Sequence, residues 1–297
     1  MKLVRNCIFI IMAVFYCVNG WSQNYGIENA DSLYRAFQIK SEYIYSFEFN
    51  KNKVKDSLIV KVNLFDSMGR LIKRFNFDDK IKDLIKSTEI YVYNSECNKL
   101  QKIITKDNIL GFSKTKEYTY SKNCTLLETV TYSADKDSKG KFGKYEYDEH
   151  NHLKKVYEKT GISGSYFIKT QMQYQNELLE KTTEYDENGS SNYYTQYFYD
   201  KTGRLKRQYY YVNGLNGILT DFKYDDYGRC KERQVVFNIH GSNFIEQWQL
   251  DMTINTPVIE YYLYYPEGLC FERKFAVNYE TTLIRAYYST DYPEDLK

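Results

Sequence analysis

The chain has 297 residues, a formal net charge of +2, 33 tyrosines and only 3 prolines. A near-neutral chain with interspersed charges has no electrostatic footprint for nucleic acid or anionic lipid, so composition argues against both classes of partner. The length is ample for a buried core, and the high tyrosine content favours sheet over helix.

The first 22 residues have the pattern of a secretory signal peptide. A basic start precedes an apolar run from Cys7 to Val18, and small residues allow cleavage after Ser22. The run is shorter than the roughly 20 apolar residues that span a bilayer. A lipoprotein processed at Cys17 is the alternative, which the bulky Tyr16 disfavours. We expect a periplasmic, cell-surface or secreted protein that does not span the membrane after cleavage.

The expected mature chain begins with a helical cap. Ile27 to Ile39 has the pattern of a short amphipathic helix, which could cover the exposed first edge of a sheet. We therefore divide the chain into a signal peptide (1–22), an N-terminal helical cap (23–40), a β-sheet domain (41–290) and a polar tail (291–297).

Two large side chains, two residues apart, recur at the ends of strand-like runs. These landmark pairs are Asn63/Phe65, Tyr91/Tyr93, Tyr118/Tyr120, Tyr145/Tyr147, Met172/Tyr174, Tyr197/Tyr199, Phe222/Tyr224, Trp248/Leu250 and Phe275/Val277. Successive pairs are 25 to 28 residues apart, and self-similarity at a fixed period indicates a repeat architecture. Residues i and i+2 of a strand share a face, so one face of the sheet should carry an aromatic column.

A turn motif follows most of these pairs, with Asp at its first position and Gly or Asn at its fourth. Asp caps backbone amides, and Gly or Asn accepts the positive φ of a type I turn closed by a bulge. The residues expected in this structural role are Asp66, Gly69, Asp148, Asn151, Asp200, Gly203, Asp225 and Gly228. Further turn signals lie midway between the pairs, so each unit is predicted to be a hairpin.

The predicted fold is therefore all-β. It is a long antiparallel meander of hairpin repeats of about 25–28 residues, with a short N-terminal helix. A flat sheet of this length is unfavourable because strands twist. We expect a curled single sheet, either a partial spiral or an open barrel, with the tyrosine column inside.

Two cysteines occupy equivalent turn positions in successive units. Cys97 and Cys124 each lie four residues after a landmark tyrosine. Equivalent positions in a regular meander lie about 9.6 Å apart, whereas a disulfide needs Cα atoms within roughly 7 Å. A disulfide between them would require two turn tips to lean together, and unpaired thiols are the alternative. Cys230 and Cys270 are the other cysteines of the expected mature chain.

The motif Tyr-Asp-x-x-Gly-Arg-Leu resembles that of the RHS/YD-repeat family. Its closest copies are Tyr199 to Leu205 and Phe65 to Leu71, and the likeness extends over most of residues 60–280. The resemblance implies long β-sheets that curl into shells in exported or surface proteins. This chain has too few units to wrap a large cargo and lacks the Asp-Pro-x-Gly-Leu motif of toxin-bearing members. It therefore resembles a short, toxin-less member.

Catalytic signatures are missing from the sequence. There is no Gly-rich phosphate loop, serine nucleophile elbow or catalytic cysteine motif. His150 and His152 could form a metal pair and the turn Asp residues could bind calcium, but ordinary turn roles explain both. We expect no enzyme activity, catalytic residue, metal or cofactor; turn-borne carboxylates such as Asp225 and Asp226 are the remaining catalytic hypothesis.

The predicted function is that of a non-enzymatic binding or structural module of the cell envelope or extracellular space. The candidate ligand-contact residues are Tyr193, Tyr194, Phe198, Tyr209, Tyr210 and Tyr211, for which core packing is the alternative role. An unknown envelope protein is the first candidate partner, and a polysaccharide on an aromatic sheet face is the second. An outer-membrane barrel is disfavoured because Glu146, Gln173 and Lys223 would face lipid at mid-strand.

Overall fold

The described residues of the computed structural model are 31–50, 53–78, 81–133, 140–191, 193–212, 215–237, 258–266, 268–277 and 280–293. The expected signal peptide, residues 23–30 of the expected helical cap and the landmark pair Trp248/Leu250 lie outside them. No helix within these ranges is long and apolar enough to cross a membrane.

Within the described ranges, one short helix and eighteen strands follow one another in chain order. They are α2 (Asp31–Ala36), β1 (Ser41–Asn50), β2 (Lys53–Phe65), β3 (Leu71–Phe77), β4 (Ile85–Tyr93), β5 (Leu100–Asp107), β6 (Ser113–Tyr120), β7 (Leu126–Ser133), β8 (Lys141–Tyr147), β9 (Leu153–Thr160), β10 (Phe167–Gln175), β11 (Leu178–Glu184), β12 (Tyr193–Tyr199), β13 (Leu205–Val212), β14 (Leu215–Tyr224), β15 (Cys230–Phe237), β16 (Val258–Tyr264), β17 (Cys270–Val277) and β18 (Glu280–Ser289). The all-β prediction is confirmed.

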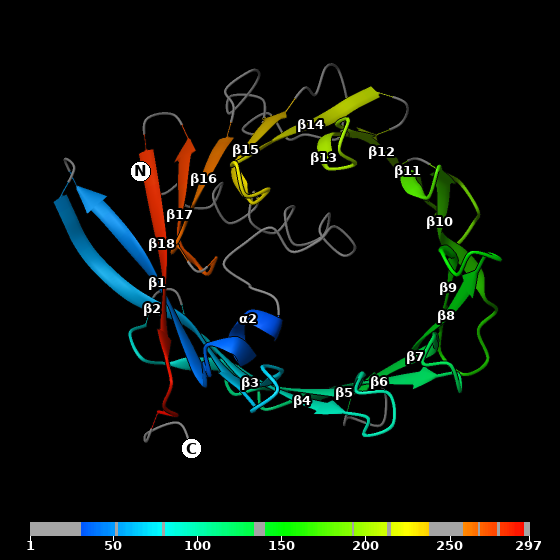
Figure 1. The fold of residues 1–297 in the computed structure, drawn as a ribbon. Coiled ribbons are helices and arrows are strands. Elements are labelled where there is room, and N and C mark those ends of the chain that lie inside the picture. Colours follow the sequence, from blue (N-terminus) through cyan, green and yellow to red (C-terminus); the bar gives the residue numbers. More distant parts are fainter. Residues whose placement is uncertain are drawn as a thin grey trace.

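The sheet closes into a barrel (Figure 1). Each strand pairs antiparallel with the next, and β18 pairs with β1 in a register that runs from Ser41 opposite Ser289 to Phe47 opposite Leu283. The first edge of the sheet is thus covered by the last strand. The predicted role of the helix as an edge cap is wrong, because pairing with β18 already satisfies that edge.

The landmark side chains face the inside of this barrel. The helix α2 lies within the ring (Figure 1), and its Tyr34 packs on Phe65 and Tyr288 with ring centroids 4.1 and 6.2 Å apart. Residues directly opposite each other in neighbouring strands share a face, so the inner face continues from strand to strand. Its largest buried cluster comprises Ile44, Leu205, Phe222, Cys230, Tyr262, Cys270 and Ala286.

The connections between strands separate into two rims. The short turns that follow landmark residues lie at one end of the barrel, here called the turn rim. The other connections, such as those between β3 and β4 and between β5 and β6, lie at the opposite end, here called the loop rim. This division is a direct consequence of an uninterrupted antiparallel meander.

A β-bulge marks the landmark residue of every tight hairpin. The register shifts between Phe198 and Tyr199, and shifts at the equivalent position in the other tight hairpins of the described chain. A bulge adds a residue on one strand and increases the local twist. The repeated bulge therefore bends the sheet by a similar amount in each unit and favours closure.

Tyrosine hydroxyl groups connect each hairpin to the one before it. The acceptor is the main-chain carbonyl near the start of the preceding return strand, the strand that follows a tight turn. The pairs, separated by 2.5 to 3.0 Å, are Tyr93–Leu71, Tyr120–Leu100, Tyr174–Leu153, Tyr199–Leu179, Tyr224–Leu205, Tyr264–Cys230 and Tyr288–Cys270. We call this series the tyrosine ladder.

The predicted phase of the last repeat is wrong. Phe275 and Val277 lie on the return strand β17, whereas the tight turn of that unit follows Tyr264 on β16 and contains Gly268 at a φ of 100°. The spacing of 25 to 28 residues between landmark pairs does not hold here, because β15 ends at Phe237 and β16 begins only at Val258.

The two turn cysteines form a disulfide. The Cα atoms of Cys97 and Cys124 are 5.5 Å apart, so the turn tips do lean together. A hydrogen bond links the turn between β2 and β3 to the turn between β4 and β5, because the Arg70 guanidinium donates to the Asn98 side chain. Cys230 and Cys270 are buried thiols, and burial raises the pKa of both to about 12.

Removal of one ladder hydroxyl should destabilise the barrel. Tyr224→Phe keeps the ring but leaves the Leu205 carbonyl without this donor, so the free energy of unfolding should fall by about 1 kcal/mol. Urea denaturation measures the change. The matched control is Tyr227→Phe in the next turn, whose exposed side chain should change stability by less than about 0.5 kcal/mol. Equal stability of the two variants would contradict the ladder.

The disulfide should act as a single stabilising unit. It closes a loop with a sequence separation of 27 residues. Chain-entropy arguments then predict that the Cys97→Ala/Cys124→Ala double variant loses about 3 to 4 kcal/mol of unfolding free energy. Each single variant should lose nearly as much as the double in urea denaturation, because either change breaks the bridge. Additive single effects would show that the bridge contributes little.

Candidate functional site

Cross-strand ion pairs occupy much of the outer wall. They form because oppositely charged side chains on one face of neighbouring strands are adjacent. The pairs are Lys102–Glu117 (3.1 Å), Lys144–Glu128 (3.5 Å), Lys155–Glu146 (4.0 Å), Arg207–Asp221 (2.5 Å), Lys223–Glu232 (2.6 Å) and Arg285–Glu272 (2.8 Å). These pairs lie on the face opposite the inward-facing tyrosines, while other pairs, such as Arg74–Glu89, lie on the inner face.

Four of the six predicted contact residues gather on the outer face of β12 and β13. Tyr194 stacks on Tyr211 with ring centroids 4.3 Å apart and planes 14° apart. Phe198 meets Tyr209 edge-on, with centroids 5.6 Å apart and planes at 86°. We call Tyr194, Phe198, Tyr209 and Tyr211 the outer aromatic cluster.

The other two predicted contact residues lie on the opposite face. Tyr193 and Tyr210 are on the inner side of the same strands, with nearly parallel rings 6.2 Å apart. The sequence run Tyr209-Tyr210-Tyr211 is therefore divided between the two faces, as the period of a strand requires. A single binding surface made of all six side chains does not exist in this fold.

Charged side chains frame the outer aromatic cluster. The Lys181 ammonium lies 4.4 Å from the centroid of Tyr194, and the Arg207 guanidinium lies 5.8 Å from that of Tyr209. Arg207 donates two hydrogen bonds to the Asp221 carboxylate, at 2.5 and 2.8 Å. These bonds raise the pKa of Arg207, which stays charged.

Most ring faces in this cluster are covered by neighbouring side chains. Lys181, Tyr194 and Tyr211 form a row across three strands in which each side chain lies against the next. Both faces of the Tyr194 ring and one face of the Tyr211 ring are therefore covered. Such a surface offers apolar contact and hydrogen bonding but little open ring face.

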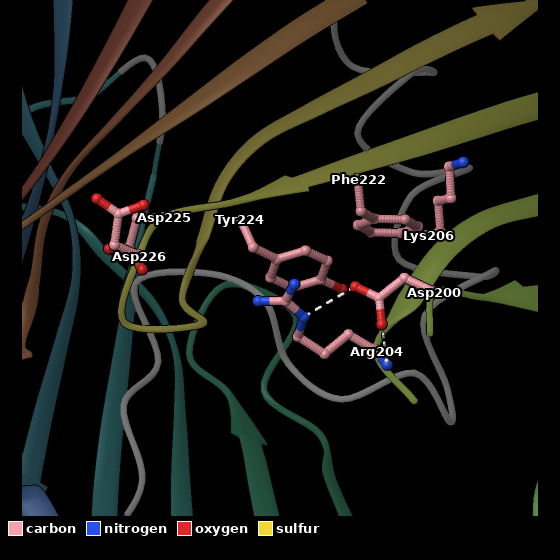
Figure 2. A pocket seen from close by; sticks show the side chains of 7 residues that line it. All are labelled: Asp200, Arg204, Lys206, Phe222, Tyr224, Asp225 and Asp226. Carbon is pink, nitrogen blue, oxygen red and sulfur yellow. Dashed lines mark hydrogen bonds and ion pairs between the residues drawn. The ribbon is translucent and has the colours of Figure 1, made fainter. Parts of the chain in front are cut away.

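A hollow of about 500 Å³ lies at the turn rim between two tight turns (Figure 2). Its lining residues are Asp200, Arg204, Lys206, Phe222, Tyr224, Asp225 and Asp226. Figure 2 shows Asp200 and Arg204 joined to each other beside the ring of Tyr224. The Arg204 guanidinium binds Asp200 at 2.9 Å and lies 5.0 Å from the ring centroid of Tyr224.

The polar side chains of the hollow already have structural tasks. The Asp200 carboxylate accepts bonds from the Thr202 hydroxyl at 2.6 Å and from the backbone amides of Thr202 and Arg204 at 2.8 and 3.0 Å. The bonds from Thr202 and Arg204 lower the pKa of Asp200 well below its usual range. Gly203 has a φ of 78° and closes the turn.

The same construction recurs at equivalent turns. Asp–Arg–Tyr sets are formed by Asp66, Arg70 and Tyr93 and by Asp225, Arg229 and Tyr264. In a third copy Asn151 has a φ of 64°, and His152 replaces the arginine, stacking on Tyr174 at 4.6 Å and lying 3.3 Å from Asp148. The hollow is therefore made of repeat residues rather than residues specific to one site.

The inner face also holds a buried carboxylate. Glu260 is 0% exposed and accepts hydrogen bonds from Arg233 at 2.8 Å, Arg273 at 3.4 Å and the Tyr262 hydroxyl at 2.5 Å. Burial opposes ionisation of Glu260, but the charges of Arg273 and Arg233 outweigh it and lower the pKa. A general acid needs a raised pKa, so the lowered pKa of Glu260 suits a fixed counter-ion to the two arginines.

Within the described ranges, no three His, Cys, Asp or Glu side chains gather as a metal site.

Lys181, Arg207 and Asp221 are the site residues that sequence reasoning missed. Their signal was present in the register across the tight turn between β12 and β13, which places Phe198 opposite Arg207. Arg207 in turn lies opposite Asp221 of β14. Extending the predicted hairpin by one strand on each side would have found Asp221 on β14 and Lys181 on β11, opposite Gln196.

No protein-family model matches the sequence, and no curated protein matches it significantly. Similar solved structures include a porin-like protein from Bacteroides uniformis (TM-score 0.41, 12% identity) and one from Bacteroides vulgatus (TM-score 0.34, 11% identity), each match covering 84% of this chain and 98% of that chain. The Tc holotoxin pore of Photorhabdus luminescens matches with a TM-score of 0.34 and 10% identity, over 85% of this chain but only 16% of that chain. These are distant likenesses and say nothing about function.

Acid should weaken the Asp200 turn. Its carboxylate has a lowered pKa in the folded state, so the charged form stabilises the fold above the unfolded value of about 3.9. This contribution is lost as pH falls through the folded pKa. Urea denaturation from neutral to acidic pH should show a shallower acid loss for Asp200→Asn than for the native chain. Asp226→Asn, an exposed position in the next turn, is the matched control, and identical slopes for native and Asp200→Asn chains would refute the turn assignment.

Proposed function

We propose that this chain is a non-enzymatic, exported binding module of the cell envelope or extracellular space that docks a protein on its outer aromatic cluster. The observation that carries the proposal is the gathering of Tyr194, Phe198, Tyr209 and Tyr211 on the outer face of β12 and β13, beside the Arg207–Asp221 ion pair. Tyrosine and arginine are the residue types enriched at the energetic centres of protein interfaces.

The rigidity of the cluster supports a docking role. Its rings are held by cross-strand stacking on two central strands, and Phe198 is 44% exposed beside the Arg207–Asp221 pair. Side chains that are already ordered lose little conformational entropy on binding. The edge-on rings also favour a protein over a polysaccharide, because stacking against sugar rings needs open aromatic faces.

Closure of the sheet limits another mode of binding. Residues Ser41–Phe47 of β1 pair with β18, so a partner strand cannot add there. The edge of β2 before Lys61 lies outside the register with β3, so the wall offers side-chain contact over most of its circumference and a backbone edge only near the β1–β2 hairpin.

Two observations support export into an aqueous compartment. The Cys97–Cys124 disulfide suits an oxidising compartment. The mid-strand charges of the outer wall suit water, since a lysine facing lipid at mid-depth costs about 2–4 kcal/mol. The signal-peptide pattern and the resemblance to exported YD-repeat proteins agree with both.

The test is an affinity pull-down of tagged exported protein from envelope extract and culture fluid, with analysis of bound protein and polysaccharide. Phe198→Ser/Tyr209→Ser should reduce capture of a stoichiometric protein partner by about tenfold or more. Tyr132→Ser is the matched control, because Tyr132 is 39% exposed on the same outer wall and lies on β7. Capture of polysaccharide without protein, or equal capture by both variants, would overturn the proposal.

A further inference from the structure

The loop rim exposes apolar side chains at the tips of successive connections. Between β3 and β10 the exposed side chains are Ile81, Leu84, Ile109, Leu110, Phe112 and Ile162. Leu110 is 72% exposed and Ile162 is 86% exposed, which are high values for aliphatic residues in a folded protein. The tight turns of the opposite rim carry polar pairs such as Lys122-Asn123 and Lys201-Thr202 at some tips, and the exposed side chains of Met68 and Tyr227 at two others.

Hydrogen bonds hold these tips in fixed positions. The Asp107 carboxylate accepts bonds from the amides of Ile109 at 3.0 Å and Leu110 at 2.7 Å, and Asp78 accepts one from the amide of Ile81 at 2.9 Å. The apolar side chains therefore project from capped turns, and their outward direction is a property of the fold.

Two of the tips are tied together across the rim. The Asn108 amide donates to the Lys86 carbonyl at 2.9 Å, and its side chain donates to the Ile85 carbonyl at 3.3 Å. These bonds place the tip that carries Leu110 beside the start of β4, next to the tip that carries Ile81. Farther round, the amide of Gly161 donates to the Gly140 carbonyl at 2.7 Å and anchors the tip that carries Ile162.

We propose that this arc of the loop rim rests on a lipid bilayer surface, with Ile109, Leu110 and Ile162 entering the boundary between headgroups and acyl chains. Apolar side chains at this boundary bind in proportion to the apolar area that they bury. Separate projecting tips fit a fluid lipid surface, whereas a protein partner would need a matching depression for each.

The charge around the tips is compatible with lipid headgroups. Lys82, Lys86, Lys106 and Lys114 are exposed beside the two tied tips. Of the nearby carboxylates, Asp83 is exposed at the first tip, whereas those of Asp78 and Asp107 accept amide hydrogen bonds within their own turns. Lysines close to a membrane add attraction to anionic lipids, so a near-neutral chain still has a locally favourable face.

This inference concerns a different surface from the proposed protein-docking site. The outer aromatic cluster lies on the wall of β12 and β13, whereas the apolar tips belong to the rim between β3 and β10. Contact through the rim would leave that wall in water and accessible to a partner.

Vesicle flotation with the protein in its exported form tests the proposal. Vesicles of phosphatidylcholine, with and without phosphatidylglycerol, should carry the native protein upward in a density gradient. Ile109→Ser/Leu110→Ser/Ile162→Ser should lower the partition coefficient by about tenfold or more. Met68→Ser/Tyr227→Ser is the matched control, because it removes exposed apolar side chains at tips of the turn rim. A near-ultraviolet circular dichroism spectrum checks that each variant is folded.

A fluorescence measurement locates the contact independently. Leu110→Trp should show an emission shift to shorter wavelength with vesicles and quenching by brominated lipid, whereas Tyr227→Trp should show neither. No flotation of the native protein, equal flotation of the rim variant, or an unquenched Leu110→Trp would overturn the proposal. So would loss of a captured protein partner in the rim variant without any effect of lipid, which would assign the rim to a protein.

Discussion

The hydrogen bond from a tyrosine hydroxyl to a carbonyl of the preceding hairpin is the interaction on which this barrel depends. It gives the tyrosines of the ladder two tasks, because the ring fills the inner face while the hydroxyl satisfies a backbone acceptor. The ladder also reaches the seam, where Tyr288 binds the Cys270 carbonyl and Tyr292 binds the Phe65 carbonyl at 2.5 Å. A nearly constant repeat length follows, since each hairpin must present its tyrosine to the unit before it.

The strand period then divides polar and aromatic roles between the two faces. Tyrosines taken inward leave the outer positions to ion pairs such as Lys102–Glu117, and these are solvated and individually weak. Where aromatic residues run consecutively, as at Tyr209-Tyr210-Tyr211, the alternation forces some of them outward. The outer aromatic cluster is therefore a local departure from the repeat, and it is the surface that we propose for docking a protein.

Much of this architecture is predictable from the sequence because local chemistry repeats. The Tyr-Asp-x-x-Gly motif predicts the bulged turn, and alternation predicts an inward tyrosine column. Closure is not predictable in this way, since pairing of β1 with β18 depends on the curvature added by every unit. The last repeat is misplaced for a related reason. Tyr264, Gly268 and Cys270 have the spacing of the turn motif, but a constant distance between landmark pairs predicts the turn at another position.

Site-specific photo-crosslinking in cells is the most direct test of the account. A benzophenone amino acid at position 198 would lie in the outer aromatic cluster, and the same group at position 132 would lie on the ion-paired wall. We predict that position 198 crosslinks to one protein in stoichiometric yield and that position 132 does not. Crosslinks to many proteins from both positions, or none from position 198, would contradict a docking role for this surface.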